Sequence, residues 1–521
     1  MERQVSNLET GLLRKNLSIR RVHNDDVFLD AGLSRRAPTP REAKKLLSDD
    51  ASLESGISQR APTPRGPKKL LNDDVECRVT GSVLLSTFVT VSGSFCTGCG
   101  VGYSSAAQSG ITKELSLSVA EYSMFGSILT FGGMIGAIFS GKIADVLGRK
   151  RAMLFAEIFC GAGWLAIALA QDAMWLDCGR LLLGVGVGLF SYVIPIYIAE
   201  ISPKHVRGSF VFANQLMQNC GISLFFIVGN FIPWRILSII GMVPCVIHVF
   251  GLFFIPESPR WLAKFGRDKE CRIALQRLRG HDADISYEAN AIKDSVESSL
   301  QGGGSRMTDL FQKRYAYPML IGVGLMLFQQ LSGSSGVTYY ASSLFQRGGF
   351  PSAIGTTVLA IIMIPKAMMG TILVEKMGRR ALLMGSCAGM CLFALLLSVS
   401  FCFQSLGVLE ELTPIFTCIG VLGHIVTFAM GMGGLPWIIM SEIFPMNVKV
   451  SAGTLVTLTN WSFGWIITYA FNFLMQWNAA GTFLVFSTVS AASIVFVYML
   501  VPETKGKTLE EIQASFSNFL R

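Results

Sequence analysis

Long apolar stretches constrain the fold of this chain more than any other feature. Twelve of them, each about 20 residues long, follow one another from residue 79 to residue 501, and each can cross a bilayer as an α-helix. They are unbroken, whereas the strands of a transmembrane barrel alternate apolar and polar residues. A mean hydropathy of +0.49 also indicates a membrane protein. The expected spans are 79–103, 122–143, 152–171, 174–199, 210–232, 234–255, 317–345, 355–374, 381–403, 412–441, 451–475 and 479–501.

Basic residues gather in the connections that follow the even-numbered spans. The opposite connections hold little more than Lys113, Arg235 and Arg347. Because positive loops stay in the cytosol, we expect both termini to be cytosolic. The net charge of +9 reflects this bias, and we expect no nucleic-acid partner.

Three charged corners occur twice in the same order. "DVLGRK" matches "EKMGRR", "EISPKHVRG" matches "EIFPMNVKV", and "PESPRWLAKFGR" matches "PETKGKTLEEI". The repeat predicts two six-helix halves, the arrangement of many transporters. The expected parts are a polar, disordered tail (1–75), the first half (76–255), a cytosolic helical linker (256–316), the second half (317–501) and a C-terminal tail (502–521).

Acidic residues stand among the bases of these corners. Charge that only sets topology explains the Lys and Arg residues but not the acids. We therefore predict ion pairs that close the cytosolic face in one state and break in the other. The predicted gate residues are Asp145, Arg149, Glu200, Arg207, Glu375, Arg379, Glu442 and Lys449.

Longer motifs join these corners. They are "GRLLLGVGVGL", "PIYIAEISPKHVRG", "PESPRWL", "QQLSGSSGVTYY", "GLPWIIMSEIFP" and "PETKGKTLEEI". The chain resembles the sugar porters of the major facilitator superfamily, most closely the plant early-responsive-to-dehydration-type monosaccharide transporters. The resemblance implies twelve helices in two pseudo-symmetric halves, a hexose substrate and alternating access. Proton-coupled transport and a non-transporting sugar sensor remain alternatives. We expect no enzyme activity, cofactor or metal.

A hexose needs amide side chains for its hydroxyls and an indole for its apolar ring face. Polar side chains inside spans are costly and therefore suggest function. The fifth span offers Asn214, Gln215, Gln218 and Asn219. The family resemblance implies sugar contacts from Gln215, Gln329, Gln330, Trp437 and Asn460, with Ser335 and Trp461 beside them.

Proton coupling needs a titratable group near the sugar. Proton-driven members of the family carry an Asp after a Gly-Tyr pair in the first helix, but this chain has Ser104 there, while Arg180 is kept. We therefore predict passive flux. Glu157 and His424 are the coupling candidates if flux is coupled, and we also expect Glu157 to join the cytosolic gate.

Most of the 12 cysteines fall inside apolar spans, where they suit packing. Cys96 and Cys99 have the spacing of a redox or metal pair, but no second pair or neighbouring His follows in sequence. We expect no functional pair from that motif.

The N-terminal tail contains dileucine patterns. Leu12 and Leu13 form one, and Glu42 with Leu46 and Leu47 forms another. Both resemble cytosolic sorting signals for the vacuolar membrane; the plasma membrane is the alternative. Sorting adaptors are expected partners, as are kinases acting on Thr-Pro sites, besides the sugar and the bilayer.

Overall fold

The computed structural model describes residues 80–203, 207–281, 283–301, 310, 312–444 and 448–505. The chain divides into two units, Met1–Val75 and Glu76–Arg521, and all described residues belong to the second. The described elements are helices, with no strand among them. Ten of these helical segments are long and apolar enough to cross a membrane, and α6 and α18 also have the length. The all-α membrane prediction is confirmed.

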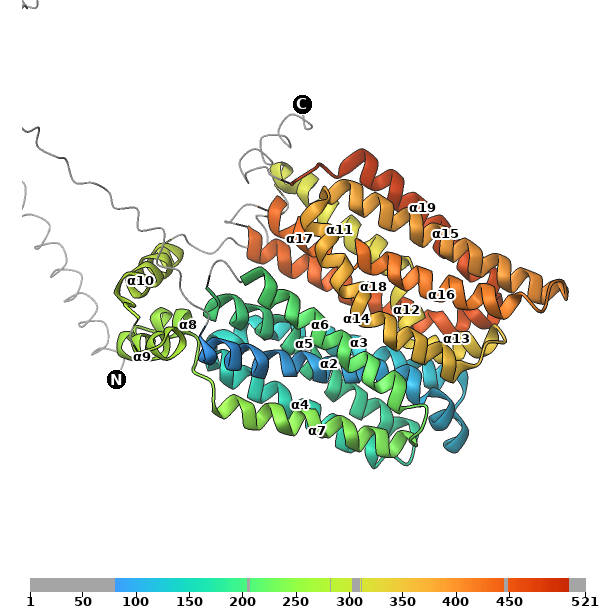
Figure 1. Ribbon diagram of the computed structural model, residues 1–521, viewed down its shortest axis with the longest axis horizontal. Helices are drawn as coiled ribbons and strands as arrows, with labels where there is room; N and C mark the ends of the chain where they lie inside the picture. Colours follow the sequence, from blue (N-terminus) through green and yellow to red (C-terminus); the bar gives the residue numbers. More distant parts are fainter. Residues whose placement is uncertain are drawn as a thin grey trace, which may run out of the picture. The chain divides into compact units, whose positions relative to one another are not determined.

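Six long helices form the N-terminal half (Figure 1): α2 (Gly81–Glu114), α3 (Val119–Leu147), α4 (Arg149–Ala168), α5 (Ala173–Ile201), α6 (Arg207–Val228) and α7 (Trp234–Phe253). Their starts follow local sequence signals. A capping box of Ser118 and Glu121 begins α3, and the Asp172 side chain accepts from a backbone N–H in the first turn of α5.

Nine helices form the C-terminal half: α11 (Lys313–Leu331), α12 (Ser334–Tyr339), α13 (Ala341–Arg347), α14 (Ser352–Lys376), α15 (Arg379–Leu406), α16 (Thr413–Met430), α17 (Leu435–Ile443), α18 (Lys449–Trp477) and α19 (Ala479–Leu500). Two predicted spans are therefore broken. The span predicted at 317–345 breaks at Gly333, whose φ of 84° is left-handed, and the span at 412–441 breaks between α16 and α17, in the glycine-rich "GMGG". The sequence did not predict these breaks.

Glycines bring α3 and α5 into close contact. A Cβ added at Gly136 would lie 2.2 Å from the Val185 carbonyl oxygen, and one added at Gly188 would lie 2.2 Å from the Gly133 carbonyl oxygen. Side chains larger than hydrogen would push the two helices apart. Such small-residue contacts replace hydrophobic burial as the source of packing between membrane helices.

Three short helices follow the N-terminal half: α8 (Pro259–Lys264), α9 (Asp268–Arg279) and α10 (Ser286–Gln301). They lie near the end of the bundle where α2 begins (Figure 1), since α8 contacts α5 and α9 contacts α2. We call this end, where α4 and α15 also begin, the basic end, and the other the opposite end.

The two halves meet along α3 with α18 and α6 with α14. Several hydrogen bonds cross between the halves toward the opposite end. The Asn472 amide donates to Ser123 Oγ at 3.1 Å, and the Ser342 backbone N–H donates to Ser105 Oγ at 2.8 Å. Asn230, just after α6, donates to Thr356 of α14 at 3.1 Å. These contacts hold the halves together at the opposite end.

Candidate functional site

A cavity of about 310 Å³ lies between the two halves. Both halves supply polar groups to its wall, and Trp461 supplies an indole face. A Cβ added at Gly133 of α3 would collide with the Trp461 ring, so this C-terminal side chain lies directly against the N-terminal half. The polar and aromatic lining residues are Ser94, Thr97, Thr130, Phe190, Ser191, Asn214, Gln218, Gln330, Ser334, Ser335, Thr338, Tyr339, Phe428, Asn460 and Trp461.

Two neighbouring glutamines of α11 have different surroundings. Gln330 lines the cavity, and its Oε1 accepts from Ser335 Oγ at 2.6 Å. Gln329 is buried and does not line it. Its Nε2 donates to the Met432 carbonyl at 2.7 Å, and its Oε1 accepts from Asn460 Nδ2 at 2.6 Å. Gln329 therefore satisfies a carbonyl freed by the break after α16 and positions Asn460.

The structure brings four of the seven expected sugar-contacting residues to the cavity: Gln330, Ser335, Asn460 and Trp461. Gln215 is exposed and lies outside the lining, whereas Asn214 and Gln218 of the same helix line it. Trp437 packs against the hydrophobic core of the C-terminal half. The helical phase of α6 was the missing information, since all three polar residues were visible in the sequence.

Arg180 of α5 is fully buried and does not line the cavity. Its Nη1 donates to the Gly100 carbonyl at 2.8 Å, its Nη2 donates to Ser104 Oγ, and its guanidinium lies 4.8 Å from the Phe125 ring centroid. Within the described residues, no ion pair with a carboxylate is found for Arg180. Hydroxyl, carbonyl and ring contacts solvate this charge instead.

The two coupling candidates lie apart. Glu157 is buried and its Oε1 lies 2.6 Å from His248 Nδ1, so it does not join the corner at the basic end as expected. His424 lies behind the cavity wall, with its Nε2 3.2 Å from Ser334 Oγ.

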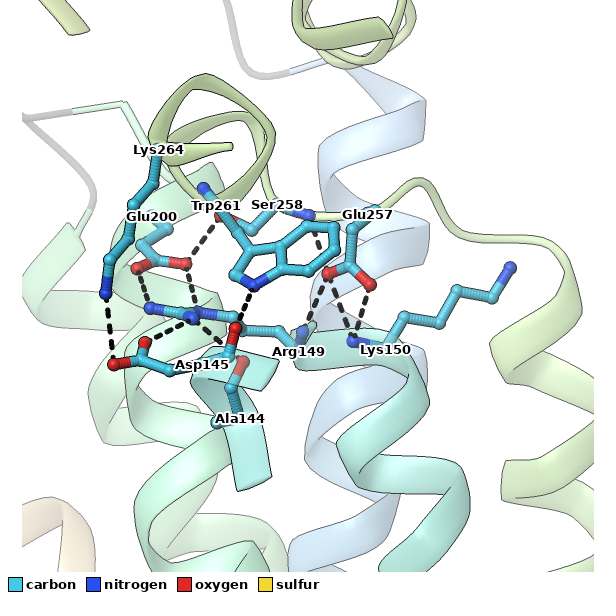
Figure 2. A network of polar contacts seen from close by, with 9 residues as sticks. All are labelled: Ala144, Asp145, Arg149, Lys150, Glu200, Glu257, Ser258, Trp261 and Lys264. Carbon is cyan, nitrogen blue, oxygen red and sulfur yellow. Dashed lines mark hydrogen bonds and ion pairs between the residues drawn. The ribbon is translucent and has the colours of Figure 1, made fainter. Parts of the chain in front are cut away.

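A dense ion-pair network forms the N-terminal corner (Figure 2). Arg149 donates to both oxygens of Glu200, at 3.0 and 2.9 Å, and to Asp145 at 3.1 Å. The linker joins this network, because Lys264 pairs with Asp145 at 3.1 Å and the Trp261 indole donates to the Asp145 carbonyl at 2.8 Å.

Among the residues that the structure describes, the matching C-terminal corner shows fewer contacts. Arg379 lies 3.6 Å from Glu442, and both Arg379 Nε and Glu442 Oε2 are buried without a described partner. Lys449 donates to the Ser441 carbonyl at 2.8 Å. The ion pairs of Arg149 and Arg379 each lie within one half, the Lys264–Asp145 pair joins the linker to the N-terminal half, and no ion pair among the described residues joins the two halves. The side chains of Arg207 and Glu375 lie outside the described residues, as do the tail leucines and Glu42.

Two glutamates that were not singled out from the sequence cap the helices of these corners. Glu257 Oε1 accepts from the backbone N–H groups of Arg149 at 2.9 Å and Lys150 at 3.1 Å, at the start of α4. Glu503 does the same for Arg379 and Arg380 of α15, at 2.9 and 3.1 Å. The repeated "PES" and "PET" motifs carried this signal.

Comparisons with known proteins agree with this architecture. The family model described as "Sugar (and other) transporter" matches residues 83–516. The chain belongs to this sugar transporter family. It is 72% identical over 520 residues to Sugar transporter ERD6 of Arabidopsis thaliana, covering 99% of both chains. It is 68% identical to Sugar transporter ESL1 of the same plant, covering 86% of this chain and 95% of the relative.

Solved structures show the same fold. The inward open conformation of the xylose transporter XylE from E. coli matches with a TM-score of 0.72 and 24% identity, over 83% of this chain and 99% of that chain. XylE, a proton:xylose symporter of the major facilitator superfamily, matches with a TM-score of 0.69 when bound to 6-bromo-6-deoxy-D-glucose, over 84% of this chain and 100% of that chain. The predicted major facilitator fold is confirmed.

Proposed function

We propose that this chain transports a monosaccharide such as glucose across a membrane by alternating access. The observation that carries the proposal is the cavity between the halves, which combines amides, hydroxyls and the Trp461 indole. Its volume of about 310 Å³ lies at the lower end of the usual range for small-molecule sites. The relatives named as sugar transporters support the same substrate class.

The cross-half hydrogen bonds toward the opposite end describe a state closed on that side. If both termini are cytosolic, as we propose, the end closed by these bonds is the non-cytosolic one. The outward state requires these bonds to break while the basic ends of the two halves approach each other. Alternating access therefore exchanges contacts at one end of the bundle for contacts at the other.

The proposed flux is passive. A symporter needs a group whose protonation changes sugar binding or switching. Arg180 contacts Ser104 and the Gly100 carbonyl, and a serine does not titrate at physiological pH. The coupling candidates for the rival, proton-coupled transport, are Glu157 and His424.

Purified protein in sealed liposomes tests transport and coupling together. We expect saturable uptake of labelled hexose down its gradient and no accumulation when only a pH gradient is imposed. Uphill uptake abolished by a protonophore would contradict passive flux. Sugar binding without uptake would favour the sensor alternative.

Two adjacent substitutions test the cavity assignment. Gln330→Ala should raise the sugar concentration for half-maximal uptake about threefold to tenfold, because it removes one hydrogen-bonding amide. Its unfolding temperature should stay close to that of the wild type. Gln329→Ala should lower both uptake and unfolding temperature, since it leaves the Met432 carbonyl and Asn460 unsatisfied. Gln312→Ala, at an exposed position, is the control. Normal uptake by Gln330→Ala would contradict the assignment.

For location, we propose the vacuolar membrane, with adaptors reading the tail leucines and kinases modifying the tail. A fluorescent fusion in plant cells tests this. Replacing Leu12, Leu13, Leu46 and Leu47 with alanine should move it to the plasma membrane, and an unchanged vacuolar distribution would contradict sorting by these leucines.

A further inference from the structure

Three helices of the N-terminal half bring metal-binding side chains together away from the sugar cavity. Cys96 of α2, Glu157 of α4 and Cys245 of α7 each place a donor atom within 4.8 Å of the other two. Their exposed fractions are 2%, 3% and 3%. None of the three lines the cavity, and the proposed transport does not use them.

Only one of the two carboxylate oxygens of Glu157 in this cluster has a polar partner with normal hydrogen-bond geometry among the described residues. Glu157 Oε1 lies 2.6 Å from Nδ1 of His248, which is fully buried. Glu157 Oε2 is also buried, and no hydrogen-bond partner with normal geometry is found for it in the part of the chain that the structure describes. A buried carboxylate oxygen without a partner is costly and calls for an explanation such as an ion.

The backbone beside His248 is shaped for this arrangement. A Cβ added at Gly93 of α2 would lie 2.7 Å from His248 Cε1. Glycine at position 93 therefore makes room for the His248 imidazole. The imidazole also contacts the ring of Phe190 in α5, at a centroid distance of 5.5 Å. The imidazole in turn orients the Glu157 carboxylate, as residues in contact with metal ligands commonly do.

We propose that Cys96, Cys245 and Glu157 bind one soft divalent cation of the zinc type, with His248 positioning the carboxylate. Thiolate sulfur and carboxylate oxygen are both zinc ligands. Tetrahedral zinc holds two sulfurs at about 2.3 Å each and hence about 3.8 Å apart. Donors within 4.8 Å of one another reach this spacing by shifts of about 1 Å or less.

Charge balance favours the replacement of the two thiol protons by one divalent cation in this buried site. Each thiol that binds the ion releases its proton, so one divalent cation replaces two protons. The net charge of the cluster is unchanged by that exchange, and no new uncompensated charge is placed among apolar helices. The bound ion would join α2, α4 and α7 and stabilise the N-terminal half.

Two other interpretations account for less. Packing explains buried cysteines but not the unpartnered oxygen of Glu157. A hydrogen-bond network without a metal, in which Glu157 contacts His248 and Cys245 contacts both Cys96 and Glu157, still leaves Glu157 Oε2 without a full hydrogen-bond geometry among the described residues. The metal site uses all three donors and the imidazole.

The test uses full-length protein in nanodiscs, with Zn²⁺ or Cd²⁺ supplied during expression and again after purification, because the donors are nearly inaccessible in the folded chain. Elemental analysis should find about one ion per chain. Cd²⁺ should produce a thiolate-to-metal charge-transfer band in the ultraviolet and raise the unfolding temperature. Wild-type protein without bound ion or band would overturn the proposal, whatever the variants do.

Variants locate the site. Cys96→Ser with Cys245→Ser should abolish the band, and Glu157→Gln should weaken binding. His248→Gln should lower affinity about 10- to 100-fold. Cys178→Ser and Cys402→Ser, at exposed positions, are matched controls that should keep the ion. A Cd²⁺ charge-transfer band that survives the double cysteine variant would refute the metal site. Metal-free sugar uptake that depends on Glu157 and on pH would also contradict it and would favour a proton shared by Glu157 and His248. Sugar uptake after chelation, measured in parallel, tests the transport proposal separately.

Discussion

The two corners at the basic end have matching sequences but different contacts. In the N-terminal corner, the Arg149 guanidinium forms a two-point contact with Glu200 and a further pair with Asp145. In the C-terminal corner, Arg379 reaches Glu442 at only 3.6 Å, and each of the two side chains has a buried atom without a partner among the described residues. The matching arginines and glutamates are therefore paired with different geometry in the two corners.

The linker adds contacts to the N-terminal corner. Trp261 and Lys264 of α8 both contact Asp145, and Ser258, just before α8, donates to Glu200 at 2.5 Å. We infer that the N-terminal corner is a fixed structural unit. Arg379 Nε and Glu442 Oε2 of the C-terminal corner have no partner among the described residues, and we expect them to find partners when the basic ends approach each other.

The largest expected difference between the corners is in stability. Arg149→Ala should lower the free energy of unfolding by about 3–5 kcal/mol, because it leaves the largely buried Glu200 side chain, 12% exposed, without its countercharge. Arg379→Ala should cost about 0–1 kcal/mol, the usual range for a looser, more accessible pair. Thermal and denaturant unfolding of both variants in the same detergent measures the difference.

A double variant provides the control for this prediction. Arg149→Ala combined with Glu200→Ala should be more stable than Arg149→Ala alone, since no uncompensated charge remains. Equal losses from Arg149→Ala and Arg379→Ala would show that the two corners are equivalent despite their geometry.

The sequence predicted where the spans and the charged corners lie along the chain, but it did not predict which side chains contact one another. The repeats located both corners, and apolar length located the spans, because these features depend on local sequence alone. Gln329 and Gln330 are adjacent, so about 100° of helical rotation decides which one reaches the cavity. The sequence did not reveal that Glu157 pairs with His248, because that contact joins two helices whose rotation is set by packing.

A second difference between the corners concerns the glycine before each arginine. A Cβ at Gly148 would lie 2.5 Å from Glu257 Oε2, and one at Gly378 would lie 2.4 Å from Glu503 Oε2. Only Gly148 has a positive φ, of 93°, whereas Gly378 has φ of −67°. Gly148→Ala should therefore be about 1–3 kcal/mol more destabilising than Gly378→Ala. Unfolding curves of the two alanine variants test this, and similar losses would mean that contact with the glutamate, not backbone strain, dominates.

The smallest expected effect is the pH dependence of folding stability that the capping glutamates Glu257 and Glu503 contribute. Its sign is opposite in the two corners. Burial raises the pKa of Glu257, and the backbone N–H groups of Ser258, Lys150 and Arg149 only partly offset it. Burial alone would also raise the pKa of Glu503, but the N–H groups of Lys505, Arg379 and Arg380 outweigh it and the pKa is lowered.

These shifts make the two caps respond to acid in opposite ways. A carboxyl whose folded pKa is raised binds its proton more tightly in the folded state, so its contribution to stability grows as the pH falls through the window between the unfolded and folded values. A carboxyl whose folded pKa is lowered stabilises the fold above the unfolded value and loses that contribution as the pH falls toward the folded one. On mild acidification, the stability of the wild type should therefore rise relative to Glu257→Gln and fall relative to Glu503→Gln. Unfolding temperatures of the three proteins across a pH series test this, and differences of the same sign would show that the two caps share one electrostatic environment.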